Sequence, residues 1–308
     1  MPIFLIHIAS ILVTLVVLQQ IPDRGAWLAV FHSLGLAHYL VSLIYARKQV
    51  VEFARQPDLF VPLFSILIIG IGVYLSRFPL LIYFAFHHAF NSAYMLNRTL
   101  PADNRYVPAL RGCVVLLHLF LYFFLLRSGA ALEIGRSNPL AFFALQRSSL
   151  PTTVLLTGLS ICYGGFFYYL YRLRSVLTRQ NLLENCGLEL LGLGAVAASF
   201  YVNFSFMAVV FYHFVFWALF PLLKMSELGT KKLGSYLGVT VLSLVGFLAL
   251  SPIGVFNFVF PPLLFRQQFY LWSYIHITTS FVLSNAHPQW IVQLFRPSLP
   301  SGTTMQRA

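Results

Sequence analysis

Hydrophobic residues fill long, nearly uninterrupted stretches of this chain, and charged residues, prolines and glycines separate them. Roughly twenty apolar residues let a helix cross a bilayer core, and the sequence holds about ten such stretches. The pattern therefore predicts an all-α, polytopic integral membrane bundle of about ten transmembrane helices. The predicted spans cover residues 3–20, 26–46, 59–75, 78–96, 107–126, 152–173, two spans within 185–224 that separate near 201–204, 233–256 and 269–295.

The remaining segments add no second domain. The stretch 129–146 is less apolar, and we expect it to be interfacial or re-entrant. No basic region precedes the first apolar stretch and no convincing small-residue cleavage site follows it, so we expect a retained span, not a signal peptide. We predict one transmembrane domain over residues 1–298 and a short C-terminal tail over 299–308.

Composition and charge support a membrane protein. The chain is 59% hydrophobic and only 9% charged, far more apolar than a soluble domain. In the ten-span arrangement, fourteen of the 20 Lys and Arg residues fall on the side of both termini and six on the other. The positive-inside rule then puts both termini in the cytoplasm. It also accounts for the net charge of +12 without any nucleic-acid partner.

All nine histidines lie in predicted spans. An ionisable ring inside a bilayer costs free energy unless it has a partner, so intramembrane histidines are candidates for proton relays, haem ligands or metal ligands. His38, His88 and His213 lie near the middle of even-numbered spans, which run parallel, so we expect the three imidazoles at similar depth. His276 and His287 are eleven residues apart, on nearly one face of the last span.

A site of several histidines with few carboxylates suits iron, copper or zinc. Iron with an open position can activate dioxygen, and a cavity within lipid favours an apolar substrate, so an oxygenase leads among these options. Of the adjacent pair His87 and His88, only one can face the interior fully, and we favour His88. For His7, His32 and His118, helix–helix hydrogen bonding is the simpler interpretation.

Several short motifs, in order along most of the chain, resemble one family. They are GLAHYL around His38, FHHAFNSAY, ELLGL from Glu189 leading to FYHF at His213, and AHPQWIVQLFRP with His287 followed by Arg296. Together they resemble the bacterial Brp/Blh proteins, which are membrane-embedded β-carotene dioxygenases that make retinal. Where that family carries Asp after its first two histidines and a second histidine in its third motif, this chain has Ser42, Asn91 and Trp217.

The resemblance implies an iron-dependent dioxygenase in the bacterial cytoplasmic membrane that cleaves a carotenoid, β-carotene to retinal, or a related apolar polyene. The polyene would enter from the bilayer, and dioxygen would be the second substrate. On this hypothesis Fe(II) is held by His38, His88, His213 and His287, and the residues near the substrate are Asn91, Tyr94, Trp217 and His276.

Two other classes remain open. One is a non-enzymatic membrane transporter or assembly factor whose histidines relay protons or contact metals transiently; the scarcity of intramembrane carboxylates counts mildly against it. The other is a haem-binding electron carrier with pairs of histidines across helices. The sequence carries no signal for an oligomeric state.

Overall fold

The computed structural model describes residues 3–20, 24–47, 51, 68–72, 80–97, 99–101, 104–127, 132–133, 150–204, 206–250 and 262–283. These residues are almost entirely helical, which confirms the all-α class. The helices are α1 (Ile3–Gln20), α2 (Arg24–Tyr45), α5 (Leu80–Asn97), α6 (Val107–Leu125), α8 (Thr152–Leu173), α9 (Arg179–Ala198), α10 (Phe206–Glu227), α11 (Thr230–Leu250) and α13 (Pro262–Leu283). Two two-residue strands, β1 (Leu132–Glu133) and β2 (Val202–Asn203), pair in parallel.

Four helical segments of the described chain are long and apolar enough to cross a membrane: Val107–Leu125, Thr152–Leu173, Phe206–Glu227 and Thr230–Ala249. Two shorter apolar helices, Ile3–Val17 and Ala29–Tyr45, accompany them. Of the predicted third span the structure describes only residues 68–72, which are helical. The predicted break near residues 201–204 is confirmed, because α9 ends at Ala198 and α10 begins at Phe206.

The last helix begins earlier than the sequence pattern suggested. We predicted a start at residue 269, after Arg266, whereas α13 begins at Pro262. Proline fits the first turn of a helix, where its missing N–H would have no intrahelical acceptor. The difference matters for the site, because it puts His276 well inside α13. The residues after Leu283, and with them the predicted end of this span and the tail, lie outside the described residues.

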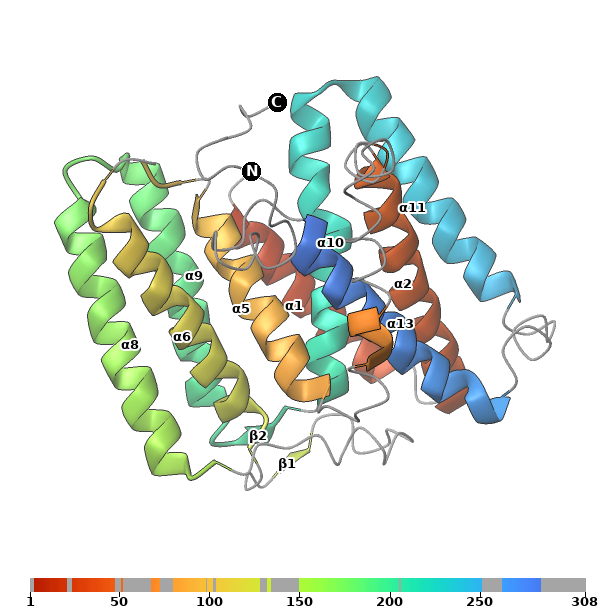
Figure 1. Cartoon of the computed structure of the whole chain (residues 1–308), viewed down its shortest axis with the longest axis horizontal. Coiled ribbons are helices and arrows are strands. Elements are labelled where there is room, and N and C mark those ends of the chain that lie inside the picture. Colours follow the sequence, from red (N-terminus) through yellow and green to blue (C-terminus); the bar gives the residue numbers. More distant parts are fainter. Residues whose placement is uncertain are drawn as a thin grey trace.

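The helices form three neighbouring groups (Figure 1). On one side α8 packs against α6, which also packs against α5; on the other, α11 packs against α2. Between them α10 contacts α1, α2 and α11, and α13 contacts α5. The largest cluster of buried apolar residues includes Phe31, Phe84, Phe211 and Phe281 and so joins α2, α5, α10 and α13. These four helices also carry most of the histidines.

Polar contacts mark both ends of α6. At its start Arg105 donates a hydrogen bond of 2.8 Å to the Tyr106 hydroxyl, and Arg172 from the end of α8 donates to the same oxygen. The two guanidinium groups, Arg105 above all, lower the pKa of the Tyr106 phenol. At the other end Arg127 donates to the Ser199 hydroxyl at 3.0 Å. The 19 residues between span about 29 Å, which matches a bilayer core.

A proline inside α10 is compensated by a neighbouring helix. Pro221 has no N–H to donate to the carbonyl of Trp217, one turn earlier. The hydroxyl of Tyr236, a fully buried residue of α11, lies 3.5 Å from that carbonyl oxygen and donates to the Ala218 carbonyl at 2.8 Å. An uncompensated carbonyl is costly in an apolar interior, so Tyr236 stabilises the α10–α11 pair at this point.

Candidate metal centre

Three histidines from three helices meet in the interior. His38 lies on α2, His213 on α10 and His276 on α13, and their candidate ligand nitrogens all lie within 4.8 Å of one another. The Nε2 atoms of His38 and His276 are 3.2 Å apart. His213 is only 1% exposed, and its Nδ1 has no hydrogen-bond partner among the described residues. The fold therefore brings together three histidines that are far apart in the sequence.

The spacing fits a shared metal ion. Two imidazole nitrogens bound to one ion at about 2.1 Å lie about 3.0 Å apart at a right angle and about 3.4 Å apart in a tetrahedron. The His38–His276 distance of 3.2 Å falls in this interval. The candidate nitrogen of His213 lies within 4.8 Å of those of His38 and His276, a limit wider than this interval. Neutral imidazoles are ligands for iron, copper, nickel and zinc.

Interhelical hydrogen bonds set the rotation of α13. The Tyr39 hydroxyl, next to His38 in sequence, lies 2.8 Å from Ser273 Oγ, one turn before His276. The Tyr39 ring also stacks on the His276 ring, with centroids 4.6 Å apart. On the opposite flank Thr278 lies 2.7 Å from the Tyr83 hydroxyl of α5. The contacts with Tyr39 and Tyr83 hold α13 so that His276 faces His38.

Neutral polar side chains contact the outer nitrogens. Ser42 Oγ lies 3.4 Å from His276 Nδ1, although the hydroxyl hydrogen is donated to the Tyr39 carbonyl at 2.7 Å. Asn91 Nδ2 lies 3.1 Å from His87 Nε2, one turn away on α5. Partners of this kind orient ligand imidazoles and select their tautomers.

The adjacent histidines of α5 face two different spaces. His87 lines a cavity of about 20 Å³ together with His213 and His276, and its ring centroid is 5.2 Å from that of His213. His88 is equally near, with its ring centroid 5.1 Å from His213, but it lines a much larger second cavity. The small cavity has room for one water-sized group. Position therefore favours His87 as a fourth ligand of a shared ion.

The other predicted site residues are more scattered. His276, expected beside the substrate, belongs to the histidine cluster, and Asn91 supports His87. Trp217 has its ring centroid 6.3 Å from that of His213. Tyr94 is 38% exposed, on an outer face of α5. His287 lies outside the described residues.

Two signals point to His276 and His87 in retrospect. Pro262 marks the start of α13 and so puts His276 well inside this helix. The predicted span began seven residues later, at residue 269, which put His276 near its beginning. Asn91 follows His87 by four residues, the spacing at which helical side chains meet. For His118 the predicted helix–helix hydrogen bonding is confirmed, because this residue of α6 contacts the buried carboxylate of Glu189 on α9 at 3.3 Å.

Comparison with known proteins adds no relative. No family model matches the chain, and no curated protein and no solved structure matches it either.

Proposed function

We propose that this protein is a membrane-embedded iron enzyme that oxidatively cleaves an apolar polyene, and that His38, His213 and His276 hold the metal. The observation that carries the proposal is the meeting of three imidazoles, from α2, α10 and α13, whose candidate ligand nitrogens lie within 4.8 Å of one another, with those of His38 and His276 at 3.2 Å. His87 supplies a fourth nitrogen near the same cavity. Among metals that accept imidazole ligands, iron gives the chemistry that a lipid-soluble hydrocarbon requires.

The chain's own residues give the site three properties. The imidazoles can bind a metal as neutral ligands. Ser42 orients the ring of His276, and Asn91 orients that of His87. Phe84, Phe206 and Phe214 line the small cavity and keep bulk water away from it. When bound, iron supplies a redox centre with a position for dioxygen. No acid or base is required, so the protein's task is to place one double bond beside the metal.

A carotenoid is the substrate class we propose, with β-carotene and retinal as the substrate and product to test first. The support is the order of the sequence motifs, which resemble those of the Brp/Blh proteins, together with α10, a helix of the cluster that is long and apolar enough to cross a membrane. A carotenoid has negligible solubility in water, so it reaches this site from the bilayer. The protein would then bind the polyene mainly through apolar contacts along its hydrocarbon chain.

We further propose ten membrane spans, both termini in the cytoplasm, and the bacterial inner membrane as the location. The contact that Arg105 and Arg172 share with Tyr106 supports this arrangement, because it puts two Arg residues of the predicted cytoplasmic side at one end of α6 and α8. Single cysteines placed after the described helices, in a variant without Cys113, Cys162 and Cys186, test the topology. Labelling of C-terminal cysteines from outside intact cells would contradict it.

The geometry disfavours a haem between these histidines. A porphyrin between two axial imidazoles needs about 4 Å between the ligand nitrogens, at about 2 Å for each bond. The His38 and His276 nitrogens are 3.2 Å apart, and the adjoining cavity of about 20 Å³ takes only a water-sized group. A mononuclear ion fits this space.

The experiment is metal analysis of the detergent-purified protein beside His213→Ala. We expect close to one iron per chain, lost in His213→Ala and kept in the control His32→Ala, which removes another buried histidine of α2. The same proteins are then expressed in a β-carotene-producing host, where the native chain and the control should yield retinal. Protein without iron in all three would refute the metal site; bound iron without any polyene product would refute the enzyme alone.

A further inference from the structure

A second polar site lies away from the histidine cluster, in a cavity of about 510 Å³. This volume lies within the range of small-molecule binding pockets. Residues of α1, α5, α6, α9 and α10 form its walls, which are mainly apolar, as in Leu15, Val114, Leu121, Leu188 and Val209. The cavity therefore has the size and lining of a ligand site, with space for an extended apolar molecule.

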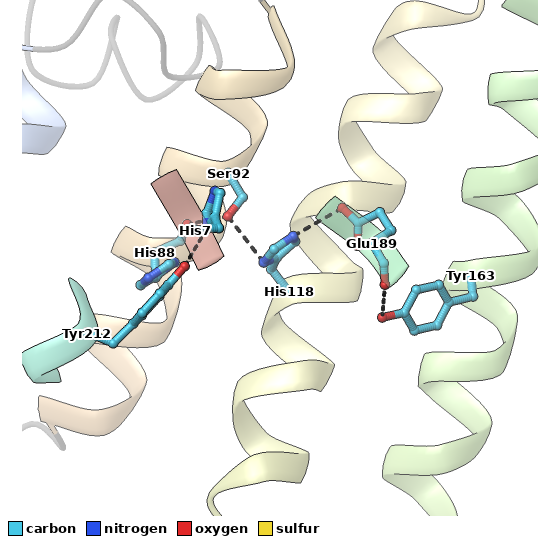
Figure 2. Close-up of polar contacts among 7 residues, drawn as sticks. All are labelled: His7, His88, Ser92, His118, Tyr163, Glu189 and Tyr212. Carbon is cyan, nitrogen blue, oxygen red and sulfur yellow. Dashed lines mark hydrogen bonds and ion pairs between the residues drawn. The ribbon is translucent and has the colours of Figure 1, made fainter. Parts of the chain in front are cut away.

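One part of the wall is polar. His118 Nε2 lies 3.3 Å from Glu189 Oε1, and His118 Nδ1 lies 3.2 Å from Ser92 Oγ, so this imidazole links a carboxylate to a hydroxyl (Figure 2). His7, which contacts the Tyr212 hydroxyl, and His88 lie on the far side of Ser92. All six side chains line the cavity. The arrangement brings hydrogen-bond donors and acceptors to one region of an apolar space.

Several of these polar atoms have no hydrogen-bond partner among the described residues. They are Glu189 Oε2, both ring nitrogens of His88, and His7 Nε2. Glu189 is only 5% exposed, and a buried carboxylate oxygen without a donor is costly. A ligand group that donates a hydrogen bond would satisfy Glu189 Oε2.

The backbone at Glu189 is held in position from α8. The Tyr163 hydroxyl donates to the Glu189 carbonyl at 3.3 Å (Figure 2). Gly192 makes this approach possible, because a Cβ there would lie 2.7 Å from the Tyr163 oxygen. Gly194, by contrast, has nothing within 4 Å of a Cβ position and lines the cavity. Gly192 thus allows Tyr163 to contact the backbone at Glu189, and Gly194 adds no side chain to the cavity.

We propose that this cavity binds a long-chain alcohol, with its hydroxyl head donating a hydrogen bond to Glu189 Oε2 and its hydrocarbon chain along the apolar wall. A hydroxyl can donate to this carboxylate oxygen, whereas an ammonium group would bring a second charge into an apolar space, where charges are costly to bury. The hydrocarbon wall accounts for the chain, and the polar region accounts for the head. This site goes beyond the iron-dependent activity and does not rest on it, because none of its residues belongs to the His38–His213–His276 cluster.

Direct binding to the full-length protein in detergent tests this site. The probes are radiolabelled geranylgeraniol and its methyl ether, which has the same chain but cannot donate a hydrogen bond. We expect the alcohol to bind more tightly than the ether. Glu189→Leu should weaken alcohol binding about 10-fold to 100-fold, the loss of one hydrogen bond to a charged group, and leave ether binding unchanged.

A matched pair of glycine variants tests the cavity itself. Gly194→Phe places a ring in the open space and should abolish binding of both probes. Gly238→Phe adds the same ring on α11, where a Cβ also meets nothing within 4 Å, and should bind both probes normally. Should Glu189→Leu not elute as a single species in gel filtration, Glu189→Gln replaces it, with an expected loss of about 3-fold to 10-fold for the alcohol alone.

Other outcomes would overturn the proposal. They are no binding of the alcohol, equal losses for alcohol and ether in Glu189→Leu, and equal binding in Gly194→Phe and Gly238→Phe. Iron content is measured on the same samples. A variant that loses probe binding but keeps its full iron content reports on the alcohol site alone. Protein that binds the probe but holds no iron contradicts only the proposed metal enzyme.

Discussion

The two histidine-containing regions of this protein differ in what surrounds the imidazoles. In the cluster of His38, His213 and His276 the rings lie close together beside a cavity of about 20 Å³, which His213 and His276 line, and the described hydrogen-bond partners are neutral. Around His118 a carboxylate takes part, and the adjoining cavity measures about 510 Å³. Imidazoles that converge on a small space suit an ion, whereas imidazoles spread along a large apolar wall suit a molecule.

The largest expected effect separates the two regions by their metal content. His276 is a ligand in the proposed centre, whereas His88 lines the other cavity. His276→Ala removes one of three ligands and should therefore lower bound iron to less than about a tenth of the native level. His88→Ala should retain it. Metal analysis of the purified variants gives the answer, and equal loss in both would show that the two regions form one site.

The next effect concerns the partner of His87. Asn91→Leu removes the hydrogen bond of 3.1 Å that orients this ring, and loss of such a partner lowers metal affinity by about 10-fold to 100-fold. Competition with a chelator measures the change. Ser92→Ala, one position along α5 in the other region, is the control and should bind metal like the native chain. An unchanged affinity in Asn91→Leu would remove His87 from the centre.

A smaller effect is expected on stability in the second region. Tyr163→Phe deletes the hydrogen bond to the Glu189 carbonyl and should lower the free energy of unfolding by about 1 kcal/mol. Tyr168→Phe, on the exposed face of the same helix, should leave it unchanged within about 0.5 kcal/mol. Equilibrium unfolding in mixed micelles compares them. Identical values would mean that the Tyr163 contact contributes nothing.

The smallest expected quantity is the coupling between the regions. His276 and Glu189 share no hydrogen-bond partner among the described residues, so the stability changes of His276→Ala and Glu189→Leu should add within about 0.5 kcal/mol in the double variant. Metal-free protein is used for all four unfolding curves. A coupling above about 1 kcal/mol would reveal a physical connection, for which His88 beside His213 is the candidate.

The sequence predicted the helices better than it predicted their contacts. Apolar length alone located α1, α6 and α8 almost to the residue, because crossing a bilayer requires a nearly fixed number of apolar residues. Two helices begin earlier than predicted: α13 at Pro262, because the charged Arg266 hid its start, and α9 at Arg179, six residues before the predicted limit at 185. The sequence also showed which helices carry histidines, and it identified His38 and His213 as candidate metal ligands.

Which imidazoles meet was beyond the sequence, because it depends on the rotation of each helix about its axis. Tyr39 and Tyr83 fix that rotation for α13 through Ser273 and Thr278, and these pairings join residues about two hundred positions apart. The neighbouring rings of His87 and His88 differ in direction by about 100° on a helix, and only packing decides which cavity each one enters. Glu189 could be noticed as a carboxylate, but its contact with His118 could not.

The distance between His38 and His276 along the chain has a consequence for biogenesis. They are 238 residues apart, and α13 is the last helix that the structure describes. During synthesis α2 enters the membrane long before its partner exists, so a ribosome must finish nearly the whole chain before the two rings can meet. Bound metal would then stabilise only chains whose insertion is complete. The proposed ion would then connect an early helix to a late one after assembly, in addition to forming a reactive centre.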